Sequence, residues 1–229
     1  MQTHPRRSYV VLTTLWWLLP VLVAFLCVSV RGAVGADELL KGKSLTLKDK
    51  PGKPQKRSLS LLSNDPSIGL GDGPGGADDP TLHGGSLRVL SIEGDVFDTT
   101  YSLPAAGWKA AKKKGTTTGY TFTQKGGPIT AVTVKAGKTI SAHGSGAVLG
   151  HTLGGNPDPV RVVLTLGSTF GGQQYCMSFG GTATPKFKAG TSYTATNAGA
   201  PGICPLPYGA DHSLPYGDSA WVCRPEMSS

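Results

Sequence analysis

Residues 44–61 read SLTLKDKPGKPQKRSLSL, and this stretch decides the class of fold. Leucine alternates with serine or threonine over residues 44–47 and again over residues 58–61, a period-two pattern typical of strands with one buried face. The residues 51–54, PGKP, favour a chain reversal because proline and glycine suit tight turns. The stretch therefore predicts two neighbouring antiparallel strands joined by a turn.

Further short runs of the same kind follow along the chain, rich in Thr, Val, Leu and Tyr and separated by Gly, Pro, Asn and Asp. The candidate strands are residues 86–92, 99–102, 119–123, 129–135, 138–142, 160–166, 174–179 and 192–195. The single helix candidate is residues 105–114. The pattern predicts an all-β fold, an antiparallel β-sandwich of about ten short strands, with jelly-roll-like and Ig-like arrangements both open.

Composition excludes several other classes of protein. The chain has 229 residues with 33 Gly and 17 Pro, and 16% of its residues are charged. This charged fraction is well below the value of about 25% that is usual for globular domains, which argues against a charge-driven disordered chain or a coiled coil. The chain is basic, with a formal net charge of +8.

The N-terminal segment has the features of an export signal. Arg6 and Arg7 precede an apolar run over residues 10–30, and the small residues 32–36, GAVGA, follow it. We therefore interpret residues 1–36 as a signal peptide cleaved after Ala36. The alternative is an N-terminal membrane anchor, because the run is long enough to span a bilayer. Both interpretations place the rest of the chain outside the cytoplasm, either secreted or at the cell surface.

The remaining chain divides into a domain and a tail. Residues 37–204 hold all the candidate strands and are expected to form one β-sandwich domain, in which the glycine-rich residues 69–80 make a long loop. The tetrapeptide LPYG occurs at residues 206–209 and again at 214–217, and two copies are too few for a repeat fold. Residues 205–229 are therefore expected to be a poorly ordered C-terminal appendage.

Cysteine usage fits an oxidising compartment. Cys27 lies in the N-terminal segment, and Cys176, Cys204 and Cys223 follow it. Cys176 and Cys204 are the expected disulfide, since each lies at the edge of an ordered segment. Cys223 is left over in the tail, either free or paired between molecules.

One set of motifs resembles a known but uncharacterised module. The motifs are residues 56–59 (KRSL), 79–82 (DPTL), 84–87 (GGSL), 101–104 (YSLP), 107–108 (GW) and 175–181 (YCMSFGG). Over about residues 41–204 they resemble a β-rich module that recurs in exported proteins of environmental bacteria. The resemblance implies export and a β fold, and no established activity accompanies it.

Two histidine motifs are the candidates for nucleophilic catalysis. His83 precedes Ser86 in HGGS, and His143 precedes Ser145 in HGSG. Neither motif has the G-x-S-x-G pattern of a nucleophile elbow, and exposed glycine-rich turns explain both. We therefore expect that the protein is not an enzyme. The alternative is a secreted hydrolase that uses His83 or His143.

The glycine-rich loop contains the candidate metal ligands. Asp72, Asp78 and Asp79 offer hard carboxylate oxygens that would suit calcium in an exported protein. Turns in which an aspartate binds its own backbone explain the same residues without an ion. His143 and His151 have no compact zinc spacing.

Two kinds of ligand surface are conceivable for such a basic domain. Basic stretches over residues 41–57 and 109–114 suggest attraction to acidic surfaces, whereas specific nucleic-acid binding is not expected because few aromatics accompany the lysines. Trp108 is the candidate for stacking on a cell-wall glycan, and the same ring also suits the core. The sequence thus predicts an exported, non-catalytic structural or binding module, with a carbohydrate-binding domain as an alternative. No further cofactor is indicated.

Overall fold

Two β-sheets make up the part of the chain that the computed structural model describes, residues 37–167, 172–181 and 185–205. The eight-stranded sheet contains, in spatial order, β12 (Lys186–Lys188), β13 (Ser192–Ala198), β2 (Gly42–Lys48), β3 (Ser58–Ser63), β9 (Thr139–Ser145), β8 (Ile129–Lys135), β7 (Thr116–Thr123) and β6 (Trp108–Lys113). The five-stranded sheet contains β1 (Asp37–Leu39), β11 (Gln173–Phe179), β10 (Val160–Leu166), β4 (Gly85–Ser91) and β5 (Phe97–Leu103). All pairings are antiparallel except that of β1 with β11.

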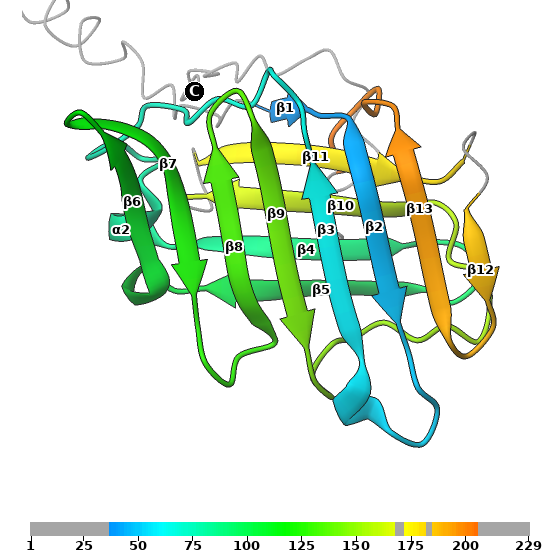
Figure 1. Cartoon of the computed structure of the whole chain (residues 1–229). Helices are drawn as coiled ribbons and strands as arrows, with labels where there is room; N and C mark the ends of the chain where they lie inside the picture. Colours follow the sequence, from blue (N-terminus) through cyan, green and yellow to red (C-terminus); the bar gives the residue numbers. More distant parts are fainter. Residues whose placement is uncertain (1–36, 168–171, 182–184, 206–229) are drawn as a thin grey trace, which may run out of the picture. The chain divides into compact units, whose positions relative to one another are not determined.

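The two sheets face each other as a sandwich, which confirms the predicted all-β class. In Figure 1 the strands of the five-stranded sheet run behind those of the eight-stranded sheet and cross them. Strand residues alternate between a core side and an outer side, as in β3, where Leu59 and Leu61 are buried. One apolar cluster fills the space between the sheets and includes Leu45, Leu87 and Val162. The period-two sequence pattern predicts this arrangement, in which alternate side chains of each strand point into the core and out to solvent.

The predicted strands agree closely with the observed ones. Residues 129–135 and 160–166 have the predicted bounds, and the others differ by a few residues at their ends. Three strands were not predicted: β1, β6 and β12. Two of them, β1 and β12, have three residues each, too few for a visible alternation.

The helix predicted over residues 105–114 is wrong. A short 3-10 helix, η2 (Ala105–Gly107), leads directly into β6. Trp108 begins this strand with its ring centroid 5.3 Å from that of Phe122, and its Nε1 donates a hydrogen bond to the Leu103 carbonyl at 3.1 Å. Burial of this indole against β7 outweighs the helix propensity of the alanines and lysines that follow.

The connection between β3 and β4 contains the predicted glycine-rich loop and ends in a single helical turn, α2 (Pro80–His83). The remaining helical turn, η1 (Pro54–Lys56), lies in the β2–β3 hairpin. Among the described residues no helix is long and apolar enough to cross a membrane. The segments predicted as a signal peptide or anchor (1–36) and most of the predicted appendage (206–229) lie outside the described residues.

Candidate functional site

The outer surface of the eight-stranded sheet is covered by hydroxyl and lysine side chains. Its outward positions alternate with the buried residues of each strand. We call this surface the hydroxyl face. It consists of Ser44, Thr46, Ser58, Ser60, Thr121, Thr123, Thr133, Thr139, Ser141, Ser145, Ser192, Thr194 and Thr196, together with Lys48, Lys109, Lys135, Lys186, Lys188, His143, Leu62 and Ala131.

Most of the polar side chains on this face make no hydrogen bond or ion pair with the rest of the described chain. Only Ser60, Thr121 and Thr139 use their hydroxyls in hydrogen bonds within the described ranges, to His143, the Lys109 carbonyl and the Ser63 carbonyl. The five lysines of the face form no ion pair there, since the two pairs found in that part of the chain are Arg57–Asp49 and Arg88–Asp98. The face therefore offers free donors, free acceptors and uncompensated positive charge.

Charge is strongly segregated between the two sheets. Residues 42–63, 108–145 and 186–198 comprise the eight strands with the hairpins between neighbours, and they hold fifteen basic side chains and one acidic side chain, Asp49. The rest of the described chain holds three basic and ten acidic side chains. Asp49 is itself paired with Arg57 at 2.9 Å. A field of one sign thus extends from the eight-stranded sheet.

His143 lies in the middle of the hydroxyl face, on β9. Its Nδ1 is 3.4 Å from Oγ of Ser60 on the neighbouring strand β3. A serine-type nucleophile would also need a carboxylate to orient the imidazole, and His143 hydrogen-bonds no carboxylate in the part of the chain described here. The described geometry is that of an exposed cross-strand pair.

His83 lies beside a separate pocket on the five-stranded sheet. The pocket has a volume of about 430 Å³ and is lined by His83, Ser86, Thr100, Ser102 and Thr165, with Gly85 and Gly167. His83 and Ser86 therefore line the same hollow. No carboxylate lines it, and the nearby Asp98 is held by Arg88 through hydrogen bonds of 2.7 Å and 2.6 Å.

The aspartates named as candidate calcium ligands make hydrogen bonds within the loop. Both oxygens of Asp79 accept hydrogen bonds: Oδ2 from Gly75 N, and Oδ1 from the amide and hydroxyl of Thr81. Through the bond from the Thr81 amide, Asp79 caps the N-terminus of α2. Burial would raise the pKa of Asp79, but these hydrogen bonds outweigh it and keep the pKa below its usual value. Asp78 Oδ2 accepts from Asp72 N at 2.8 Å. These are the aspartate turns that the sequence allowed as an explanation without an ion.

Two buried polar atoms near this loop have no hydrogen-bond partner, Asp78 Oδ1 and the Tyr120 hydroxyl. Burial raises the pKa of Tyr120 to about 12, with the charges of Asp79 and Asp78 acting in the same direction. The only cluster of three potential metal-binding side chains in the described chain is Asp37, Cys176 and Cys204. Its two sulfurs are bonded to each other, so they are not free ligands.

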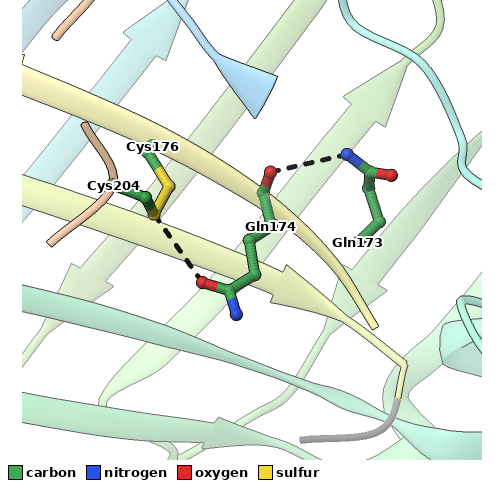
Figure 2. The surroundings of a disulfide bond; sticks show 4 residues. All are labelled: Gln173, Gln174, Cys176 and Cys204. Atoms are coloured by element: carbon green, nitrogen blue, oxygen red, sulfur yellow. Dashed lines mark hydrogen bonds between the residues drawn. A yellow bond between two sulfur atoms is a disulfide. The ribbon is translucent and has the colours of Figure 1, made fainter. Parts of the chain in front are cut away.

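The predicted disulfide Cys176–Cys204 is confirmed. It joins the middle of β11 to the segment after β13, across a sequence separation of 28 residues (Figure 2). The side chain of Gln174 lies beside it, with Oε1 3.7 Å from Cys204 Sγ. A disulfide is compatible with an oxidising compartment.

Two side chains singled out by the sequence are core residues. Trp108 is 4% exposed, so its ring is not available for stacking on a glycan. His151 is 1% exposed, whereas His143 is exposed, and Nε2 of His151 lies 3.0 Å from the Lys48 carbonyl. Sequence reasoning missed the hydroxyl face as a surface. The alternation of Ser and Thr with Leu was visible, but the order of the strands was not.

In comparisons with known proteins, no family model, curated protein or solved structure matches the chain.

Proposed function

We propose that this protein is a non-catalytic binding module that acts outside the cytoplasm and attaches to a negatively charged polymer surface through its eight-stranded sheet. The observation that carries the proposal is the segregation of charge, with fifteen basic side chains and one acidic side chain on that sheet and its hairpins. An acidic surface would be attracted to this side of the domain and repelled by the other.

Two further features support a role in binding outside the cell. The N-terminal residues 1–36 have the pattern of an export signal, and the Cys176–Cys204 disulfide is compatible with an oxidising environment. The non-catalytic role is supported by the surroundings of His83 and His143, neither of which hydrogen-bonds a carboxylate within the described ranges.

Retention on charged and neutral beads tests this function. The full chain, kept in an uncharged detergent, is applied to neutral polysaccharide beads and to the same beads after carboxylation. We expect retention on the carboxylated beads alone at about 0.05 M salt, and release at about 1 M salt, where the screening length falls to ~3 Å.

Two results would contradict the proposal. Retention on both kinds of bead that survives high salt would indicate a neutral carbohydrate-binding domain. Absence of retention on either would leave no support for attachment through charge. Circular dichroism at both salt concentrations controls for unfolding.

A further inference from the structure

We infer that the ligand of the hydroxyl face is a linear acidic polysaccharide that lies across the strands, from β12 at one edge to β6 at the other. This inference rests on the proposed function and adds the class of ligand and its direction. It follows from the register of the strands, the spacing of the charges and the placement of the aromatic rings.

Strand register aligns the outward side chains in rows perpendicular to the strands. One row runs through Lys186, Thr194, Thr46, Ser60 and His143, each opposite the next on the neighbouring strand. The next row runs through Thr196, Ser44, Leu62, Ser141, Thr133, Thr121 and Lys109. Each row thus begins or ends with a lysine and contains mainly hydroxyls elsewhere.

The two charged edges are far apart. Neighbouring strands are about 4.8 Å apart, so eight strands place β12 and β6 about 34 Å from each other. A short anion can contact one edge, whereas a long polymer can contact both. Contact with the second edge is then effectively intramolecular and adds affinity without new kinds of contact.

The chemistry between the edges favours a polysaccharide. Ten of the thirteen hydroxyls have no partner in the described chain, so they are available to the ring hydroxyls of a sugar. The aromatic rings of these strands lie on the core side, including Tyr120, Phe122 and Tyr193, so the face has no platform for stacking nucleic-acid bases. The face carries five lysines among thirteen hydroxyls, so it can pair with carboxylates and with sugar hydroxyls along the same polymer.

The first test measures affinity against ligand length. Oligomers of a polyuronic acid that extend over about half of the 34 Å span, or beyond it, are titrated into the full chain at low salt. We expect the long oligomer to bind at least about ten-fold more tightly per molecule than the half-span oligomer. Salt-sensitive binding with no gain in affinity on lengthening would overturn the direction assigned here and leave the proposed function standing.

The second test changes each edge in turn. Besides Lys109, the edge strand β6 carries the exposed Lys112. We expect Lys186→Glu with Lys188→Glu, and separately Lys109→Glu with Lys112→Glu, to reduce the affinity for the long oligomer to that for the half-span oligomer. The matched control, Lys53→Glu with Lys125→Glu, makes the same change of charge in exposed hairpin loops and should lower affinity at most about two-fold. An equal loss in the control would show that net charge alone binds the ligand.

The third test addresses the hydroxyls. Thr46→Val with Thr133→Val keeps the side-chain shape and removes two hydroxyls from the rows. We expect a loss of about five-fold for the uronic oligomer and no change for extended polyglutamate of equal span, which lacks sugar hydroxyls. Equal behaviour of the two ligands, or tighter binding of a single-stranded oligonucleotide of equal span, would overturn the assignment to a polysaccharide.

Discussion

Arg57 donates a hydrogen bond from Nε to Oδ1 of Asp49 across 2.9 Å, where the β2–β3 hairpin meets the body of the sheet. Asp49 is the one carboxylate among the strands and hairpins of the eight-stranded sheet, and this pairing neutralises it. Arg57 also donates from Nη1 to the Leu149 carbonyl at 3.1 Å. The pair therefore fastens the hairpin to a distant loop and leaves the other basic groups of the sheet without a counter-charge on it.

Replacement of Asp49 by Asn should lower the free energy of unfolding by about 2 kcal/mol, because the side chains of Asp49 and Arg57 are only 8% and 19% exposed. Urea denaturation measures the change. Lys50→Ala, at an exposed neighbouring position, is the control and should stay within about 0.5 kcal/mol of the wild type. A loss for Asp49→Asn as small as that of the control would show that the pair contributes no stability.

The disulfide should stabilise the domain by about 3 kcal/mol, since it closes a loop with a sequence separation of 28 residues in the unfolded chain. Cys176→Ser with Cys204→Ser is the test, with the midpoint of thermal unfolding as the readout. Peptide mapping after alkylation of the non-reduced protein checks the bond itself. Label on both Cys176 and Cys204 without reduction would contradict the pairing.

Trp108→Ala should destabilise the protein by about 3–5 kcal/mol, because it leaves a cavity against Phe122 and removes the hydrogen bond to Leu103. Trp108→Phe fills most of that space and should therefore destabilise the protein less than Trp108→Ala does. Any loss of ligand binding in Trp108→Ala is then expected to accompany a loss of native circular dichroism. A fully folded Trp108→Ala protein with impaired glycan binding would restore this ring as a ligand contact.

His151 should make stability depend on pH in the range below neutrality. Burial lowers the pKa of His151 below its usual 6.5, with the Arg57 charge in the same direction and the Lys48 carbonyl and Asp49 opposing it. The unfolded chain then binds a proton that the folded chain does not. The contribution of neutral His151 to the free energy of unfolding is fully present above about pH 6.5. It is lost as the pH falls toward the folded-state pKa.

His151→Gln tests this origin, because a glutamine amide can still donate to the Lys48 carbonyl but does not titrate. Urea midpoints from about pH 7 to pH 5 should fall for the wild type and stay flatter for the variant. Parallel curves for the two proteins would assign the pH dependence to other groups. His143→Gln is the matched control at an exposed position, and its curve should follow the wild type.

Removal of calcium should leave the thermal midpoint unchanged. The carboxylate oxygens of Asp79 are already occupied by Gly75 and Thr81, and one oxygen of Asp78 by Asp72 N. Thermal unfolding with a chelator and with about 1 mM calcium, the weak-affinity range of extracellular calcium sites, measures the difference. A rise of several degrees with calcium that is absent in Asp78→Asn would establish an ion at Asp78 Oδ1, the unpartnered oxygen.

Much of the fold follows from the sequence alone because strand patterns are local. The alternation in residues 44–47 and 58–61 defines which side chains are buried before any partner strand is known, and β8 and β10 have their predicted bounds. The Cys176–Cys204 pair also follows, since few cysteines are available. The prediction failed at residues 105–114, where local helix propensity was overcome by the burial of Trp108 against Phe122 of β7, the hairpin partner of β6.

The candidate site depended on tertiary structure. Alternation with leucine or valine shows that Thr46, Ser60 and Thr133 point outward, but only strand order and register place them on one surface with Lys186 and Lys109 at opposite edges. β12 and β6 are separated by more than seventy residues in sequence, and their positions result from pairings made through six other strands. The sequence thus determined which face of each strand is polar. The tertiary structure decided which of these faces adjoin, because long-range pairing is set by the joint packing of all strands around one core.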